Sequence, residues 1–428
     1  MDRTLPERKT TLIGILLMLY FSIIACENSA RNIYGGFIAL AGAIIIDNIF
    51  SKDRLKVRFP FSCKLFYYFT VYTFFGRIWA HDLYFVGNLS RQIIAVLLLI
   101  AIPTNYFIKK KNPSAVIAAV ACVGVILSMY VIKTEGGFSA FYEHATREGA
   151  RVGKEVSNVN RIGMAAALSS VVLAFYSFVM KKRWCIPLCA LTFMVTAASG
   201  SRKSLLLLGA GVFLMILLTQ KDRQAVVKFF KMLFWLIIGF FVLKFLFSLE
   251  IMSAVRVRWD GLIASLTGDS INADASADSR IKMLKFGWEQ FRQHPFLGVG
   301  IGNSKVLYWE NYGSYMYLHN DYIEQLVNGG IFGFLLYYGN ILYLFVKHIK
   351  LMKIKKDPEI VMSFIILVLF LIMNTACVTY YDFLQTALYF TLWITTVEVK
   401  KIEFANLENP PSDEGKEITG GGAVKCVP

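Results

Sequence analysis

The chain has 428 residues, of which 56% are hydrophobic and 17% are charged, and its mean hydropathy is +0.53. This composition is too apolar for a soluble domain of this size and indicates a helical membrane protein. The formal net charge is +16, but the basic residues stand in short clusters between apolar runs, so we expect no nucleic-acid partner.

Apolar runs long enough to cross a bilayer recur along nearly the whole chain. They predict an all-α, polytopic membrane fold with about 12 transmembrane helices, in which the lipid bilayer is an obligatory partner. The predicted ranges are 11–26, 33–49, 62–80, 91–108, 114–132, 160–180, 184–199, 204–219, 229–249, 319–346, 358–377 and 380–398.

Clusters of lysine and arginine occupy every second loop, and the positive-inside rule assigns these loops to the cytoplasm. Both termini then lie inside. We expect one transmembrane domain over residues 1–405 and a disordered cytoplasmic tail over residues 406–428, which contain several glycines and prolines. The clusters lie at 52–58, 109–111, 181–183, 221–228 and 347–356.

Two predicted outer loops are long, at about 133–159 and about 250–318. The second is a large external loop with room for short helices. Within it, residues 268–280 are polar and we expect them to be mobile, whereas residues 279–295 have the spacing of an amphipathic helix lying on the outer surface. The apolar stripe of that helix consists of Ile281, Leu284, Phe286, Trp288 and Phe291.

Neither the cysteines nor the histidines show the spacing of a metal or disulfide site. The seven cysteines contain no CxxC pair and the five histidines no HExxH pattern. We therefore expect no metal and no cofactor.

Basic residues on the predicted outer side depart from the charge rule and become candidates for function. Arg202 and Lys203 stand in the tight turn "SGSRKS" between two apolar runs. A charge so close to hydrocarbon usually pairs or lines a cavity, and for Arg202 we favour an anion-binding role. For Lys203 we favour snorkelling of the ammonium to lipid headgroups.

Three further external arginines are less distinctive. Arg280 begins the amphipathic segment, and a guanidinium is suited to a diphosphate because it donates bidentate hydrogen bonds. Arg147 and Arg151 are equally compatible with solvated side chains. The stretch "HPFLGVGIGNS" lacks the strand–helix context of a dinucleotide site and predicts a turn.

The stretch "YLHNDYIEQLVNGGIFG" puts His319 just before the start of a long helix. Asn320 or Asp321 can cap that helix, and the positive end of its dipole disfavours a charged imidazole, so His319 can act as a base or simply lie at the interface. Gly330 and Gly333 predict close helix packing.

His319-Asn320, nine residues, Gly330, two residues and Gly333 together resemble the signature of the bacterial O-antigen ligase and O-antigen polymerase superfamily. "SGSRKSLL" is similar to the serine–arginine turn of that family, and "SRIKMLKFGWEQFRQHPFLGVGIGNS" to a stretch of its large external loop. "RVGKEVSNVNRIG", which includes Arg151, resembles a weaker external motif. The resemblance is specific over about 195–335.

The resemblance implies a metal-independent membrane glycosyltransferase of the plasma membrane, with its active site facing outward. It implies transfer of a glycan from undecaprenyl diphosphate to an acceptor sugar or glycolipid. His319 corresponds to the essential histidine, and Arg202 and Arg280 to the diphosphate-binding arginines. Asn320, Asp321 and Arg151 would support them.

Two questions stay open on the sequence. The motifs do not separate ligases from polymerases. A transporter of polysaccharide or lipid-linked glycan also suits about twelve spans, although the sequence has no internal repeat and its distinctive polar residues lie outside the membrane midplane.

Overall fold

The computed structural model describes residues 11–50, 59–219, 248–267 and 275–408, with a few single positions between 227 and 245. Every regular element among these residues is helical, which confirms the all-α prediction. Most of the predicted span 229–249 lies outside the described residues.

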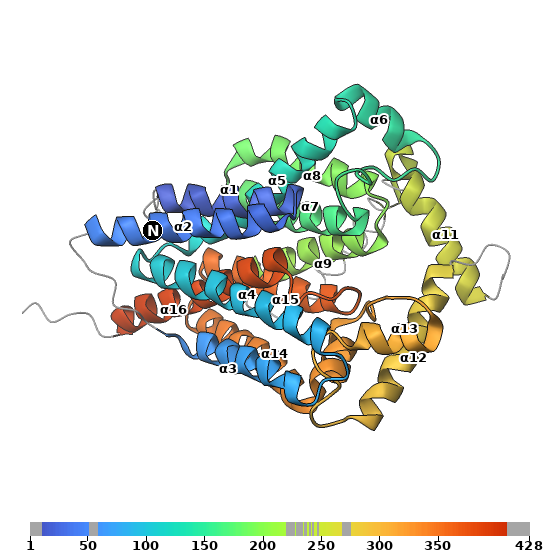
Figure 1. Cartoon of the computed structure of the whole chain (residues 1–428). Coiled ribbons are helices and arrows are strands. Elements are labelled where there is room, and N and C mark those ends of the chain that lie inside the picture. The colour runs from blue at the N-terminus through green and yellow to red at the C-terminus, as the bar shows by residue number, and fades with distance from the viewer. Residues whose placement is uncertain are drawn as a thin grey trace, which may run out of the picture.

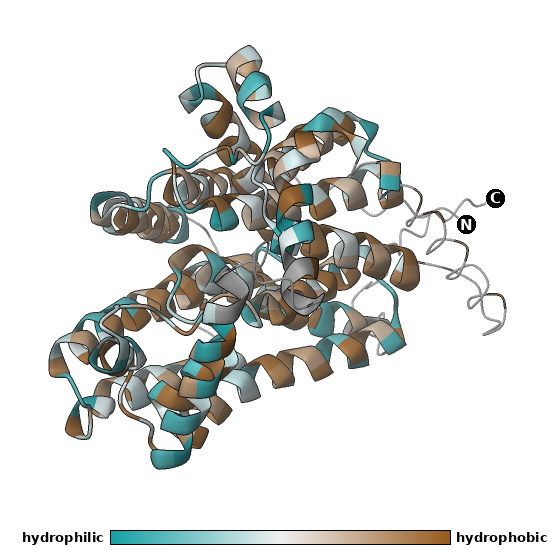
Figure 2. Ribbon diagram, turned by 90° about the vertical axis from the view of Figure 1, so that its right-hand side faces the viewer, coloured by the Kyte–Doolittle hydropathy of each residue, from teal (hydrophilic) through white to brown (hydrophobic). Residues whose placement is uncertain are grey.

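Helices occupy the other eleven predicted ranges (Figure 1). Six described helices are long and apolar enough to cross a membrane, and three further apolar helices are shorter, so the count of about 12 spans remains a prediction. Their ribbons are mostly hydrophobic along their length (Figure 2). The main helices in the eleven predicted ranges are α1 (Leu12–Cys26), α2 (Ala30–Phe50), α3 (Phe61–Phe75), α4 (Leu83–Lys109), α5 (Pro113–Thr134), α7 (Val159–Ala174), α8 (Ile186–Ala198), α9 (Arg202–Thr219), α14 (Asp321–Ile354), α15 (Pro358–Asn374) and α16 (Leu388–Glu408).

Helix α7 is the centre of one half of the bundle and is buried along nearly its whole length. Small residues let α5 approach it closely: the backbone N–H of Gly124 donates to Ser169 Oγ at 2.9 Å. A Cβ at Gly124 would lie 2.1 Å from that oxygen. The α5–α7 contact therefore depends on glycine, as helix contacts in membranes often do.

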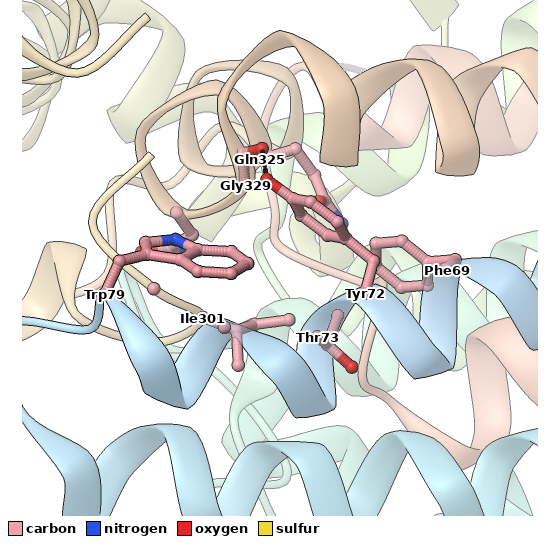
Figure 3. A pocket seen from close by; sticks show the side chains of 10 residues that line it. Phe69, Tyr72, Thr73, Trp79, Ile301, Gln325 and Gly329 are labelled. Atoms are coloured by element: carbon pink, nitrogen blue, oxygen red, sulfur yellow. Dashed lines mark hydrogen bonds between the residues drawn. The ribbon is translucent and has the colours of Figure 1, made fainter. Parts of the chain in front are cut away.

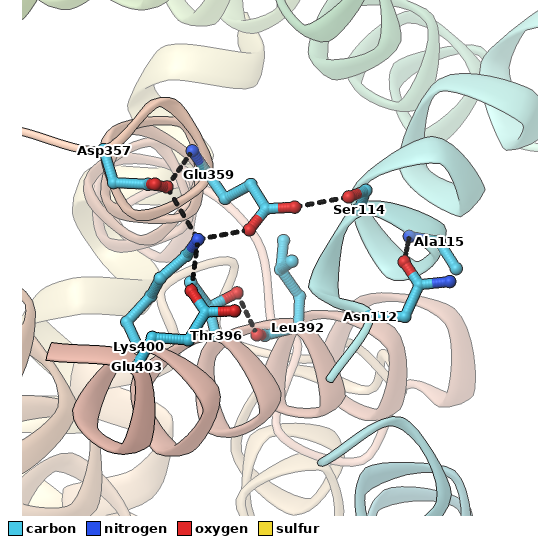
Figure 4. A network of polar contacts seen from close by, with 9 residues as sticks. All are labelled: Asn112, Ser114, Ala115, Asp357, Glu359, Leu392, Thr396, Lys400 and Glu403. Carbon is cyan, nitrogen blue, oxygen red and sulfur yellow. Dashed lines mark hydrogen bonds and ion pairs between the residues drawn. The ribbon is translucent and has the colours of Figure 1, made fainter. Parts of the chain in front are cut away.

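The helix ends that carry the predicted cytoplasmic lysines are tied together. Lys110 forms an ion pair with Asp47 at 3.1 Å, joining the ends of α4 and α2. Lys400 of α16 is 2% exposed and pairs with Asp357, Glu359 and Glu403 at 2.9, 2.5 and 3.0 Å (Figure 4).

This Lys400 cluster also reaches α5, because Ser114 Oγ donates to Glu359. A single buried ammonium thus meets three carboxylates where α15 and α5 begin and α16 nears its end. A buried charge is tolerated only with such partners. The cluster fixes the order of these helices at the end that the positive-inside rule assigns to the cytoplasm.

The predicted outer segments gather at the opposite end of the bundle (Figure 1). Three of the helices there fall in the predicted external loop. The predicted tail begins three residues later than expected, because α16 continues to Glu408; residues 409–428 lie outside the described residues. The short helices are α6 (Phe138–Thr146), α11 (Ser253–Thr267), α12 (Ala275–Gln293) and α13 (Ser304–Tyr312).

Helix α12 starts earlier than the sequence predicted. Residues 275–280, expected to be mobile with the rest of 268–280, form its first turns, and residues 268–274 lie outside the described part of the chain. Met283 and Phe286 are buried against α13 and the start of α14, whereas Ile281 and Trp288 of the predicted stripe are 52% and 49% exposed. The helix therefore packs through Phe286 of the predicted stripe together with Met283, and leaves Ile281 and Trp288 outside.

Candidate functional site

The turn between α8 and α9 brings three elements within contact. Gly200 has φ of +62°, a conformation that glycine adopts without strain. A Cβ at this position would lie 3.0 Å from the Ala254 Cβ and 3.1 Å from Arg151 Cγ. Glycine is therefore needed both for the turn and for the close approach of Arg151 from the preceding outer loop and of α11.

Arg151 is held against this turn by hydrogen bonds. Its Nε donates to the Ser199 carbonyl at 2.9 Å, and its Nη2 donates to Asn160 Oδ1 at 2.8 Å. Burial, together with the positive charges of Arg258 and Arg202, lowers the pKa of Arg151 to about 10. The side chain remains charged at neutral pH, so the turn gathers positive charge.

Arg258 and Arg202 interlock at the same turn. Arg258 Nη1 donates to the Gly200 carbonyl at 3.2 Å, and Arg202 Nη1 donates to the backbone carbonyl of Arg258. Arg202 is only 9% exposed. Backbone carbonyl groups thus help to position both guanidinium groups at the same turn.

Lys203, for which the sequence favoured snorkelling to headgroups, makes a hydrogen bond within the protein. Its Nζ donates to the Ala376 carbonyl, in the loop that follows α15. The lysine therefore links the α8–α9 turn to the loop between α15 and the π-helical turn η5 (Phe383–Ala387).

His319 sits in a strained turn just before α14. Its φ is +55°, which is uncommon for a residue with a side chain. Glu324 Oε2 accepts from the Leu318 N–H at 2.8 Å, and Asn320 Oδ1 accepts from the Ile323 N–H at 3.1 Å. These two side chains hold the backbone on both sides of His319, and Asn320 is the residue that caps α14.

The surroundings of the His319 ring favour its neutral form. The ring lies 4.1 Å from the Tyr317 ring, centroid to centroid. Burial, together with the charges of Lys203 and Arg280, lowers the pKa of His319 to about 4. The α8–α9 turn and the start of α12 therefore both bring positive charge close to the imidazole.

Asp321 serves the loop after α15 rather than the His319 ring. Its Oδ1 accepts from the N–H groups of Thr379 and Tyr380 at 2.6 and 3.2 Å, and its Oδ2 accepts from the Tyr338 hydroxyl at 2.6 Å. The carboxylate thus fixes the loop that also accepts from Lys203. Its support for His319 is indirect, through the position of that loop.

The predicted turn at 294–304 docks on α14, where the helix is broken. Gly330 has φ of +56° and ψ of −166° inside the helix. The backbone N–H of Val299 donates to the Val327 carbonyl at 2.9 Å, and that of Ile331 donates to Pro295 at 2.8 Å. The break frees helical backbone groups, and the turn satisfies them.

Tyr72 and Trp79, from α3 and the turn after it, cover this junction (Figure 3). The Tyr72 hydroxyl lies 2.8 Å from the Gly329 carbonyl and 3.0 Å from that of Leu297. A Cβ at Gly333 would lie 2.9 Å from the Tyr72 ring. The glycines of the "NGGIFG" stretch thus leave room for the Tyr72 ring and for the backbone of the turn at 294–304 to approach α14.

The predicted residues fall into two adjoining groups. Arg202 and Arg151 meet at the α8–α9 turn, and Arg280 acts on His319 through its charge. Arg147 is apart from both: it is exposed and pairs with Glu143 at 2.6 Å. Sequence reasoning missed Arg258, because one arginine in "AVRVRWD" looks like any exposed arginine until α11 folds over Gly200.

Comparison with known proteins agrees with the motifs. Residues 187–338 match the family model described as O-antigen ligase, a range that runs from α8 to the middle of α14 and includes Arg202, Arg280 and His319. No curated protein gives a significant match to the chain. The match over residues 187–338 supports the resemblance of this helical membrane protein to the O-antigen ligase and O-antigen polymerase superfamily.

Proposed function

We propose that the protein is an inverting, metal-independent glycosyltransferase of the bacterial plasma membrane. It moves a glycan from undecaprenyl diphosphate to an acceptor sugar outside the membrane. The observation that carries this proposal is the position of His319, held in the turn before α14 against the Tyr317 ring, where burial and the charges of Lys203 and Arg280 lower its pKa.

His319 would act as the general base. The acceptor hydroxyl is a weak nucleophile, and a neutral imidazole can take its proton as the new bond forms between the hydroxyl oxygen and the anomeric carbon. The bond from the anomeric carbon to the diphosphate oxygen breaks on the opposite face, and its electron pair leaves with the diphosphate. Direct displacement inverts the anomeric carbon.

Arg202 and Arg280 would bind the diphosphate and stabilise the charge that grows as it departs. Arg151 and Arg258 would add positive charge to the same site, because both donate hydrogen bonds to backbone carbonyls of the turn that precedes Arg202. Guanidinium groups positioned in advance lower the cost of reorganisation during transfer.

The runner-up is a transporter of lipid-linked glycan, which would move the donor without breaking a bond. The two functions differ in a measurable way. The protein, purified in lipid, is given undecaprenyl diphosphate-linked repeat units alone, and products are resolved on a gel. A ladder identifies a polymerase, and product that appears only with a separate acceptor identifies a ligase. Unchanged lipid in both, over several glycans, would favour the transporter.

Two variants separate chemistry from donor binding. His319→Ala should abolish transfer and keep donor binding, whereas Arg202→Gln should weaken donor binding as well. Arg292→Gln is the matched control, because Arg292 is an exposed arginine of α12. Full transfer by His319→Ala would exclude the general-base role.

A further inference from the structure

A lysine enclosed by two tyrosines lies beside the His319 turn. Lys305, in the first turn of α13, has its Nζ 5.8 Å from the centre of the Tyr317 ring and 5.3 Å from that of the Tyr381 ring. Its Nζ also donates to the Tyr381 hydroxyl at 3.3 Å. Helix α13, the segment before α14 and the loop after α15 therefore build one cation–aromatic group, which we call the Lys305 cage (Lys305, Tyr317 and Tyr381).

The Lys305 cage is fixed by buried polar contacts below it. The backbone N–H of Ser304 donates to Asn328 Oδ1 of α14 at 2.8 Å, and Ser304 is fully buried. The carbonyl of Tyr381 accepts from Gln92 Nε2 of α4 at 2.8 Å. The lysine and one of its rings are thus anchored to different helices of the bundle before any ligand arrives.

Tyr317 joins the Lys305 cage to the candidate base. Its ring lies 4.1 Å from the His319 ring, while it also faces the Lys305 ammonium. The Arg280 charge acts on both Tyr317 and His319. The Lys305 cage therefore lies next to His319. The α8–α9 turn also contributes positive charge near His319, through Lys203.

The Lys305 ammonium keeps hydrogen-bonding capacity. An ammonium has three donors, and the Tyr381 hydroxyl takes one. No ion pair joins Lys305 to a carboxylate within the described ranges. The nearby Glu324 is fully buried: one oxygen accepts from Leu318, and the other has no hydrogen-bond partner among the described residues. Because Lys305 is only partly buried, its remaining donors are available to a ligand.

We propose that the Lys305 cage is the subsite for the acceptor sugar. Aromatic rings offer apolar faces that stack on a pyranose ring, and the ammonium donates to a hydroxyl or carboxylate oxygen of the same sugar. The position beside Tyr317 would bring an acceptor hydroxyl to His319. This inference rests on the proposed glycosyl transfer and adds the place where the acceptor binds.

A purely structural role makes a different prediction. If Lys305 only holds Tyr381 in place, removal of the Tyr381 hydroxyl should reproduce the loss of Lys305. If it binds the acceptor, Tyr381→Phe should have a small effect, because the ring and the ammonium remain. Lys305→Arg should restore part of the function, because it keeps the charge and the donors.

The test uses the full chain in lipid nanodiscs. The donor is the purified lipid-linked repeat unit of the source bacterium, and the acceptor is a membrane fraction of that bacterium lacking this protein. Each is titrated while the other is held constant. Lys305→Met should raise the amount of acceptor needed for half-maximal rate by about tenfold, the effect expected from losing one charge-assisted hydrogen bond. Donor half-saturation should stay within about twofold, since donor binding does not use Lys305.

Lys285→Met is the matched control, because Lys285 is an exposed lysine of α12 and should leave both titrations unchanged. Wild-type transfer with unaltered acceptor titration in Lys305→Met would overturn the subsite alone. An equal shift in Tyr381→Phe, or a shift in donor titration of the same size, would overturn it as well. Absence of transfer by the wild type at every acceptor amount would instead overturn the proposed function, and the subsite with it.

Discussion

Gly298 and Gly330 touch through their backbones. A Cβ added to Gly330 would lie 2.7 Å from the Gly298 N and 2.2 Å from the Phe296 carbonyl oxygen, and one added to Gly298 would lie 2.5 Å from the Gly330 N. Both residues have positive φ, 68° and 56°. Two glycines 32 positions apart in the sequence thus join the turn at 294–304 to α14 at one backbone junction.

Gly330→Ala should destabilise the protein and reduce transfer. The added methyl group meets backbone atoms that cannot move aside, and the left-handed conformation alone costs about 1–3 kcal/mol. Thermal unfolding in detergent should therefore begin at a lower temperature. Gly339→Ala in the same helix is the control, because nothing lies within 4 Å of its added Cβ. Equal melting temperatures for the two variants would contradict this account.

The pH dependence of transfer should follow the low pKa of His319, about 4. A base works when unprotonated, so the rate should stay level from pH 7 to about pH 5 and fall as pH approaches 4. Lys203→Met removes a positive charge that lowers this pKa, so the fall should begin at higher pH. Lys203→Arg keeps the charge and should retain the wild-type profile. A fall near pH 6.5 in the wild type would argue against the buried, charge-surrounded imidazole.

Arg151→Gln should weaken donor binding. Its guanidinium adds charge to the turn that presents Arg202, and the loss of one charged hydrogen-bonding group typically weakens binding by about tenfold or more. Arg147→Gln is the control, because Arg147 is exposed and pairs only with the exposed Glu143 among the described residues. Donor binding measured with fluorescent undecaprenyl diphosphate would compare the two. Equal affinities would remove Arg151 from the site.

Lys400→Met should be strongly destabilising. It leaves Asp357, Glu359 and Glu403 close together without their shared cation, and breaking a buried ion pair costs about 3–5 kcal/mol. Lys401→Met next to it is the control, because Lys401 is exposed. The readout is the fraction of folded protein after heating. If Lys400→Met resists heat as well as Lys401→Met, the cluster does not stabilise the bundle.

The sequence by itself determined the helical class and the candidate residues. Long apolar runs that cross a bilayer form helices, because a helix gives the backbone N–H and C=O groups hydrogen-bond partners within the same segment. The spacing of His319-Asn320 and Gly330-x-x-Gly333, with the serine–arginine turn, indicated the family that residues 187–338 match. These patterns involve residues that are close together in the sequence, so they can be recognised without the tertiary structure.

Only the tertiary structure decided which charges meet. The residues around Arg258 and Lys305 in the sequence do not distinguish them from other basic residues. Arg258 bonds to Gly200, 58 residues away, and Lys305 bonds to Tyr381, 76 residues away. The sequence favoured a headgroup contact for Lys203. In the structure its ammonium donates to the Ala376 carbonyl, because the loop after α15 lies against the α8–α9 turn. Charge and hydrogen bonding act through space, so the electrostatics of His319 follow from packing rather than from the order of the residues.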